Sequence, residues 1–249
     1  MGCVCLSGRL LAGCEDLVIS ANETYRRVAI ERGGKRPQDV VAVYSVPERM
    51  QRTAPSEALR KGARLVLGYV GVIGDQDGVD HFVRMLQYIR KDCGHADIRG
   101  IVVGDGPALP AVRQLTADLA LTDSITFTGY LRGEELLSAI STFDIGIIPD
   151  PVNEYNDKIS MNKVFEYSAL GVPSVSYDLS ETRQLLGPVG QYAQDATPKG
   201  LARACLTLID DDKLRAERGR AAKALADEKF DWGRERGKYL AAYQRLIEL

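Results

Sequence analysis

From residue 65 to the end of the chain, short apolar runs alternate with longer segments in which apolar residues recur at helical spacing. The short runs are rich in Val, Ile and Tyr. Apolar strands flanked by helices are typical of a parallel sheet that is covered on both faces. The pattern therefore predicts an α/β fold with a doubly wound, Rossmann-like parallel sheet. The predicted strands are 65–70, 99–103, 124–128, 144–149, 173–177 and 189–193, and the predicted helices are 78–92, 107–120, 133–142, 161–170, 180–186 and 197–210.

The first part of the chain has a different organisation. A strand over 16–20, a helix over 22–31 capped by Asn22 or Ser20, and a strand over 40–44 make one partial βαβ unit. Two strands and a helix cannot bury both faces of a sheet. We therefore expect this unit either to dock on the main domain or to be the remnant of a larger one.

These patterns predict four parts of the chain. Residues 1–47 hold the partial unit, and 48–64 are a linker rich in Pro and charged residues. Residues 65–231 form the main domain. Residues 232–249 are a terminal amphipathic helix, which we expect to cross back and pack on the first part.

Composition and charge exclude several classes of protein. The 249 residues carry a formal net charge of −2, so a uniformly basic nucleic-acid binder is excluded and no nucleic-acid partner is expected. Five cysteines without a CxxC pair and only two histidines are typical neither of a zinc site nor of a disulfide framework. No apolar run approaches the ~20 residues that cross a bilayer.

Positive charge is concentrated near the front. Residues 24–64 contain ten Lys and Arg against four Asp and Glu, a net of +6, which leaves −8 for the rest of the chain. Such a patch attracts phosphates or an anionic membrane surface, and it is equally compatible with an ordinary solvated face. The expected location is the cytoplasm, with attachment to the inner face of the membrane as the second possibility.

The most informative segment is 156–173, which follows a predicted strand and opens a helix. Ser160 can cap this helix, and Gly171 can end it in the left-handed conformation. At 100° per residue, Asn162, Lys163 and Glu166 fall together on the side opposite the apolar face. This spacing predicts a polar trio beside the carboxyl edge of the sheet.

The trio suits a nucleoside diphosphate. The free amides of Met161, Asn162 and Lys163 would bind a phosphate, and Lys158 and Lys163 would add positive charge. The carboxylate of Glu166, one turn further on, could accept hydrogen bonds from two ribose hydroxyls. The alternative is a plain amphipathic helix on which Lys163 and Glu166 form a surface ion pair.

Three further turns are candidates for ligand contacts. Two are glycine-rich turns after predicted strands, and the third, 127–131, has a backbone that could read the edge of a base. None matches GxGxxG or a Walker loop, which argues against a dinucleotide dehydrogenase. The candidate residues are Gly71, Gly74, Gly104, Asp105, Gly106, Tyr130 and Leu131.

Four motifs occur in order: Gly104-Asp105-Gly106-Pro107, then 125–129, 144–149 and 162–173. This series resembles the carboxy-terminal domain of glycosyltransferase family 4, the group 1 glycosyltransferases of the GT-B fold. The resemblance covers about 65–249, and it covers 14–47 weakly, as a remnant of the amino-terminal domain.

The resemblance implies retaining, metal-independent transfer of a sugar, of hexosyltransferase type, from a nucleotide diphosphate sugar, with no cofactor beyond that donor. It implies that Glu166 binds the ribose and that the amides of Met161–Lys163 hold the distal phosphate. Gly104–Gly106 and Thr128–Leu131 would surround the nucleoside. The acceptor would be a glycan or a lipid-linked molecule, as in polysaccharide biosynthesis.

The sequence also departs from the family. Many members have two glutamates eight positions apart, whereas the first of these positions is Lys158 here. Many carry an Arg and a Lys after the first strand, where this chain has Val72 and Asp77. Most of the acceptor-binding half is missing, so we expect a truncated or partner-dependent enzyme, with a partner subunit or a dimer covering the front. The alternative is a non-catalytic nucleotide-binding or interaction module.

Overall fold

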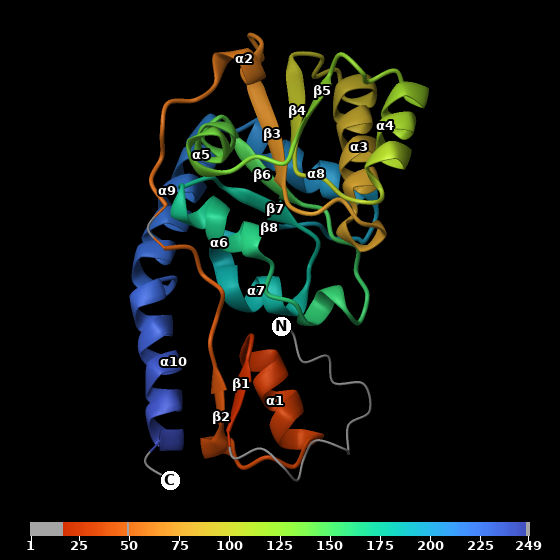
Figure 1. Ribbon diagram of the computed structural model, residues 1–249. Coiled ribbons are helices and arrows are strands. Elements are labelled where there is room, and N and C mark those ends of the chain that lie inside the picture. Colours follow the sequence, from red (N-terminus) through yellow and green to blue (C-terminus); the bar gives the residue numbers. More distant parts are fainter. Residues whose placement is uncertain (1–16, 49, 248–249) are drawn as a thin grey trace.

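The computed structural model describes residues 17–48 and 50–247 (Figure 1). Within them, six parallel strands form the main sheet in the order β5-β4-β3-β6-β7-β8. This confirms the predicted α/β, doubly wound parallel sheet. The strands are β3 (Leu65–Val70), β4 (Ile98–Val103), β5 (Ile125–Gly129), β6 (Ile145–Ile148), β7 (Ser174–Ser176) and β8 (Gln191–Tyr192).

Helices cover both faces of this sheet, with α3 and α4 on one face and α5 and α6 on the other (Figure 1). Each predicted helix of the main domain is present, with ends that differ by a few residues. The helix predicted over 78–92 ends in a π-helical turn at Tyr88–Asp92. The helices are α3 (Val79–Gln87), α4 (Leu109–Asp118), α5 (Gly133–Ser141), α6 (Asn162–Ala169), α7 (Ser180–Leu186), α8 (Pro198–Ile209) and α9 (Asp212–Lys229).

The core is centred on β3, all six residues of which are buried. Gly68 lies in the middle of this strand because the ring of Phe143 packs against its backbone. A Cβ atom at Gly68 would stand 2.0 Å from Phe143 Cγ, far inside van der Waals contact. The glycine of this apolar run therefore serves packing between the strand and the segment after α5.

The amino-terminal unit contains β1 (Val18–Ser20), α1 (Glu23–Glu31) and β2 (Val40–Ala42). The two strands pair in parallel as a separate sheet. Asn22 caps α1, as predicted, because its side-chain oxygen accepts a hydrogen bond from the backbone N–H of Tyr25. The predicted start of the first strand, at residue 16, lies outside the described residues.

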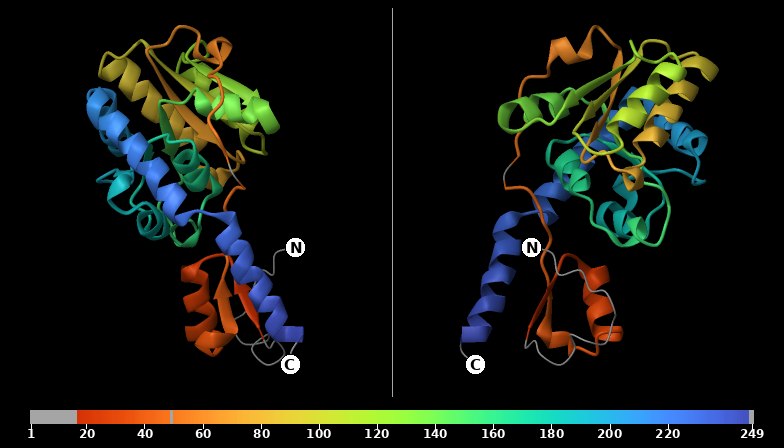
Figure 2. Two further views of the ribbon diagram at one scale, coloured as in Figure 1. Left: turned by 90° about the vertical axis from the view of Figure 1, so that its left-hand side faces the viewer. Right: turned by 45° about the vertical axis from the view of Figure 1, so that its right-hand side comes forward.

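The terminal helix α10 (Trp232–Ile247) runs beside this unit (Figures 1 and 2). Glu235 Oε2 accepts a hydrogen bond of 2.8 Å from the backbone N–H of Tyr44. Near the other end, Arg245 donates to the carbonyl oxygen of Gln38 at 2.6 Å. The helix therefore lies where the sequence predicts it, against the amino-terminal part.

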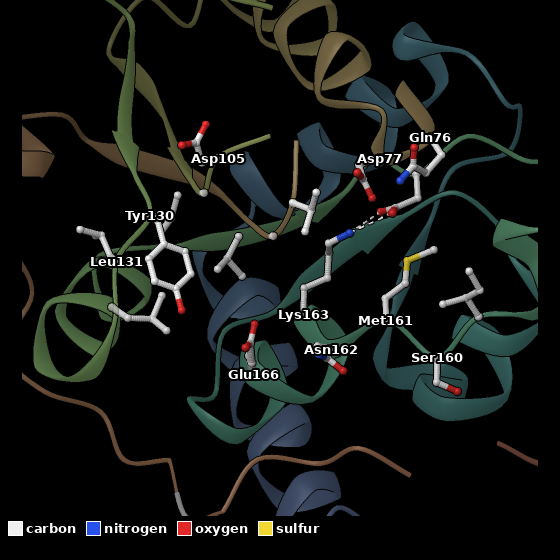
Figure 3. A pocket seen from close by; sticks show the side chains of 18 of the residues that line it. Gln76, Asp77, Asp105, Tyr130, Leu131, Ser160, Met161, Asn162, Lys163 and Glu166 are labelled. Atoms are coloured by element: carbon white, nitrogen blue, oxygen red, sulfur yellow. Dashed lines mark hydrogen bonds and ion pairs between the residues drawn. The ribbon is translucent and has the colours of Figure 1, made fainter. Parts of the chain in front are cut away.

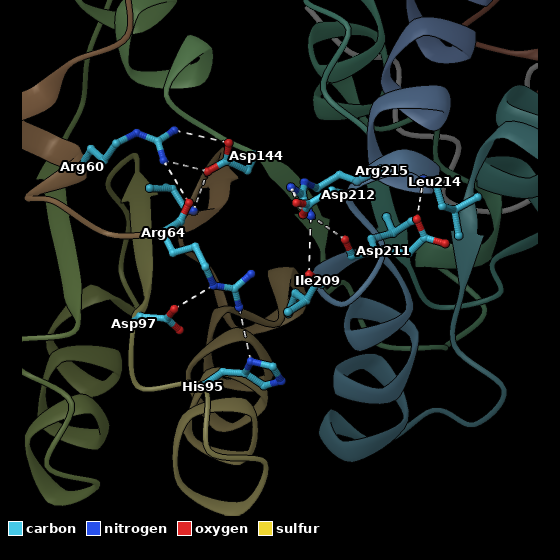
Figure 4. Close-up of polar contacts among 12 residues, drawn as sticks. Arg60, Arg64, His95, Asp97, Asp144, Ile209, Asp211, Asp212, Leu214 and Arg215 are labelled. Atoms are coloured by element: carbon cyan, nitrogen blue, oxygen red, sulfur yellow. Dashed lines mark hydrogen bonds and ion pairs between the residues drawn. The ribbon is translucent and has the colours of Figure 1, made fainter.

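The segment predicted as a linker contains a short helix, α2 (Glu57–Arg60), capped by Ser56. The guanidinium group of Arg60 pairs with Asp144 at 3.0 Å, and Asp144 also accepts a hydrogen bond from the backbone N–H of Val66 (Figure 4). These contacts fix α2 at the amino-terminal edge of the main sheet. No helix of the described part of the chain is long and apolar enough to span a bilayer.

Candidate functional site

A pocket of about 630 Å³ lies at the carboxyl ends of the central strands. From β3 the chain builds the sheet outward through β4 and β5, and it then returns to add β6 on the other side of β3. This reversal of strand order leaves a crevice, which is where ligands of open α/β sheets bind. The loops after β3, β4, β5 and β6 all contribute to its walls (Figure 3).

Most of the predicted site residues line this one pocket. The exceptions are Gly74, Gly106 and Lys158, which are not in contact with it. Gly106 instead permits a close approach of two loops, since a Cβ there would stand 2.4 Å from the carbonyl oxygen of Ile73. The predicted residues that line the pocket are Gly71, Gly104, Asp105, Tyr130, Leu131, Met161, Asn162, Lys163 and Glu166.

The start of α6 opens onto the pocket. Its N-cap residue is Met161, which makes no side-chain cap, so the first amides of the helix have no side-chain acceptor. The prediction that Ser160 caps this helix is wrong: its hydroxyl donates to Glu181 Oε1 at 2.7 Å. Gly171 ends the helix region with a φ of +62°, as predicted. An uncapped helix start of this kind favours an anion.

Lys163 is buried, although helical spacing placed it on the side of the helix opposite the apolar face. Its Nζ atom lies 2.9 and 2.8 Å from the two carboxylate oxygens of Asp150 and 5.0 Å from the ring centroid of Tyr69. The alternative of a surface pair with Glu166 is therefore wrong. A lysine can be buried here because the carboxylate at the end of β6 supplies the counter-charge.

Burial raises the pKa of Asp150 above its ordinary value, and the ammonium group of Lys163 partly offsets this rise. Asp150 was not predicted as a site residue. The signal that could have found it is its position: it is the first polar residue after β6, a fully buried strand, and so stands at the ligand-binding edge of the sheet. Asp77 also faces this region, and its carboxylate accepts a hydrogen bond of 2.8 Å from the backbone N–H of Gly74.

Glu166 is the lining carboxylate without a fixed partner. Within the part of the chain that the structure describes, its side chain makes no hydrogen bond or ion pair, and it faces the pocket (Figure 3). Burial raises the pKa of Glu166, and Lys163 partly offsets this effect. A half-buried carboxylate whose oxygens are directed into a cavity is suited to accept hydrogen bonds from a ligand.

The pocket does not carry the positive charge that the sequence reasoning expected. The ammonium group of Lys158 lies outside it, 2.6 Å from Glu154 Oε1. The lining residues with ionisable acidic or basic side chains are Asp77, Asp105, Arg132, Asp150, Lys163 and Glu166. With all of them ionised the pocket has two positive and four negative side chains, so its side chains together do not attract an anion, and the backbone amides at the start of α6 gain in importance for holding one.

A family model described as "Glycosyl transferases group 1" matches residues 64–211. The chain belongs to the group 1 glycosyltransferases. It is 29% identical over 238 residues to the 2-deoxystreptamine glucosyltransferase of Streptomyces kanamyceticus, covering 88% of this chain and 58% of that protein. It is 27% identical to the alpha-D-kanosaminyltransferase of the same organism, covering 75% of this chain and 47% of that protein.

Solved structures with the same fold include a sucrose-phosphate synthase from Thermosynechococcus elongatus, with a TM-score of 0.77 and 16% identity. The match covers 94% of this chain and 59% of that one. The HepE protein of Anabaena, crystallised with UDP, gives a TM-score of 0.70 at 18% identity and covers 94% and 64%. The chain thus spans about half to two thirds of the length of these group 1 and GT-B proteins.

Several lining residues of this glycosyltransferase pocket were not predicted as ligand contacts. They lie at the carboxyl ends of strands, in the segments that follow them or at the start of α5, and this place at the carboxyl edge of the sheet is the signal that could have found them. Asn156 is the best fixed: its side chain donates to the carbonyl oxygens of Gln76 and Pro151 at 3.0 and 2.8 Å. The further lining residues are Val70, Val72, Gln76, Asp77, Val103, Arg132, Gly133, Leu136, Asp150, Tyr155, Asn156, Ile159 and Ser160.

Proposed function

We propose that the pocket binds a nucleoside diphosphate sugar. One observation carries this proposal: the unpartnered carboxylate of Glu166 stands about one turn beyond a helix start whose amides open onto the same cavity. The amides near Met161 and Asn162 would hold the distal phosphate, and Glu166 would accept hydrogen bonds from the two ribose hydroxyls. Tyr130 and Leu131 would flank the nucleoside.

The proposed reaction is retaining, metal-independent transfer of a hexosyl group to a glycan or a lipid-linked acceptor, in the cytoplasm and as part of polysaccharide biosynthesis. It is the reaction implied by the likeness to glycosyltransferase family 4. The transfer of a hexosyl group is supported by the names of the relatives, which are a glucosyltransferase and a kanosaminyltransferase. The use of a nucleotide donor is supported by UDP in a structure of the same fold.

The acceptor would be held largely by a second lobe. Every lining residue of the pocket lies between 70 and 166, so the described part of the amino-terminal unit contributes none. On α10, an apolar surface formed by Tyr239, Leu240, Tyr243, Leu246 and Ile247 is exposed. We propose that an α/β lobe from a partner subunit or a second copy covers this surface.

Sedimentation tests this part of the proposal. Association that is abolished by Leu240→Lys, a substitution at an exposed position, would support a second copy. A monomer at every concentration would contradict self-association through this surface. The proposal would then require a separate subunit that co-purifies with the protein from its natural host.

The alternative is a nucleotide-binding module without transfer. Two observations favour it. The pocket has more carboxylates than cations. In addition, Lys158 occupies the position at which many family members have a glutamate that contacts the sugar, and here this lysine pairs with Glu154 instead. The two functions share nucleotide binding and differ in whether the sugar is ever transferred or hydrolysed.

Calorimetric titration tests the shared step. We expect UDP or GDP, and the corresponding sugar nucleotides, to bind with measurable heat, and Glu166→Ala to reduce the affinity. NADH serves as the negative control, since no dinucleotide fingerprint occurs. No heat with any nucleoside diphosphate would overturn the proposal. Nucleotide binding without release of sugar, even with acceptors added, would favour the non-catalytic module.

A further inference from the structure

The loop that leads into α6, residues 151–161 and here called the donor loop, is fixed from two sides. On the side of the main domain, the side chain of Asn156 binds the carbonyl oxygen of Gln76. Asp157 Oδ1 accepts a hydrogen bond of 2.7 Å from the backbone N–H of Ser180, at the start of α7. These contacts hold the first half of the loop to the main domain.

The second half is held by the amino-terminal unit. The side chain of Asn22 is fully buried, and its Nδ2 atom donates to the carbonyl oxygen of Lys158 at 2.8 Å and to the hydroxyl of Ser160 at 3.0 Å. Its Oδ1 atom caps α1 by accepting from the N–H of Tyr25 at 2.7 Å. One carboxamide therefore joins the start of α1 to Lys158 and to the pocket-lining Ser160, near the end of the donor loop.

A buried carboxylate closes this arrangement into a ring. Glu181, at the start of α7, is fully buried and accepts from the hydroxyl of Ser160 at 2.7 Å and from that of Thr24 at 2.6 Å. Because Thr24 lies on α1, two residues after Asn22, the donor loop, α7 and α1 share one network. Leaving any buried member without its partner costs free energy, so the network specifies one conformation of the loop.

We propose that Asn22 is a positioning residue of the donor site: the amino-terminal unit sets the conformation of the donor loop, and nucleotide affinity depends on this contact. The inference rests on the proposed function, since it concerns the same pocket. Ser160 lines that pocket and α6 begins two residues later, so a loop released from Asn22 presents the helix start in several arrangements. Coupling of this kind is reciprocal, so a bound nucleotide would hold the amino-terminal unit in place.

Two variants separate positioning from general stability. Asn22→Ser keeps an N-cap acceptor for α1, since serine is a good N-cap, but it loses the second arm that reaches Lys158 and Ser160. The matched control is Asp211→Ala, which removes the N-cap of α9, where Asp211 accepts from the N–H of Leu214 at 2.8 Å, without touching the donor loop. Both proteins are measured at full length by UDP calorimetry and by amide hydrogen exchange.

We expect Asn22→Ser to weaken UDP binding about tenfold, as for the loss of one or two hydrogen bonds, and to speed amide exchange over 156–161. We expect Asp211→Ala to lower Tm while leaving affinity and loop exchange unchanged. Wild-type affinity in Asn22→Ser would overturn the inference. If the wild type binds no nucleotide, the proposed function fails. In that case the positioning role is still tested separately: it is overturned if Asn22→Ser leaves amide exchange over 156–161 unchanged.

Discussion

The ammonium group of Lys163 lies 2.8 Å from Asp150 Oδ2, and both side chains are buried beneath the pocket. Asp150 follows β6 and Lys163 belongs to the first turn of α6, so this ion pair ties together the two ends of the donor loop. A buried ion pair of this kind contributes little net stability compared with an apolar pair of the same shape. Its consequence is that Lys163 would meet the phosphate of the proposed nucleotide as a partly neutralised cation.

Removal of one partner of this pair has a large expected effect. Asp150→Asn leaves the buried ammonium of Lys163 without a counter-charge, and we expect the free energy of unfolding to fall by about 3 kcal/mol. Lys163→Met should cost a similar amount, because it leaves the carboxylate of Asp150 unpaired. Urea unfolding of both variants and of the double variant provides the check. If the losses in free energy of unfolding from the two single variants simply add in the double variant, the direct pairing is contradicted.

For Glu166, stability and binding are expected to change in opposite directions. Because burial raises its pKa above the ordinary value of 4.5, the folded protein retains this proton to higher pH than the unfolded chain. As the pH rises from about 4.5 through the raised pKa, ionisation of Glu166 therefore lowers the free energy of unfolding. Over the same interval nucleotide affinity should increase, because the ionised carboxylate accepts hydroxyl hydrogen bonds.

Glu166→Gln tests both directions. At neutral pH we expect a higher Tm than in the wild type and about 10- to 100-fold weaker UDP binding. The 2′-deoxyribose analogue of UDP is the matched ligand. It should bind the wild type more weakly than UDP does, and Glu166→Gln should reduce its affinity less than it reduces that of UDP. If the variant binds UDP as the wild type does, the carboxylate does not contact the ribose.

The sequence predicted the sheet because each central strand is a short, mostly apolar run between helical segments. It predicted Glu166 because helical spacing fixes the angle at which a side chain leaves the helix. The same spacing could not predict the environment of Lys163. Its burial depends on the carboxylate of Asp150, which lies on another element. The role of Ser160 was missed for a similar reason, since its partners, Asn22 and Glu181, come from distant parts of the chain.

A substitution at Gly104 is expected to disrupt the base of the pocket. Its φ is +142°, and a Cβ there would stand 1.8 Å from the carbonyl oxygen of Gly71, so the backbones after β3 and β4 touch at this point. Gly104→Ala should cost more than about 4 kcal/mol, because strain and a backbone clash add. Gly94→Ala is the control: φ is +79° but nothing lies within 4 Å, so we expect only the strain of about 1–2 kcal/mol. Similar Tm values for the two variants would show that the loops separate easily.

The two lysines near α6 should differ in their effect on phosphate binding. Lys158 forms an ion pair with Glu154 outside the pocket, whereas Lys163 lines it. We expect Lys158→Ala to change stability by a few tenths of a kcal/mol and to leave the affinities for UDP and UMP unchanged. Lys163→Ala should weaken UDP more than UMP, because its remaining positive charge lies near the helix start that would hold the distal phosphate. Since Lys163→Ala also lowers stability, both titrations are made at a temperature where each variant is folded, as checked by circular dichroism. A loss of UDP affinity in Lys158→Ala would mean that this side chain leaves Glu154 and turns into the pocket when the nucleotide binds.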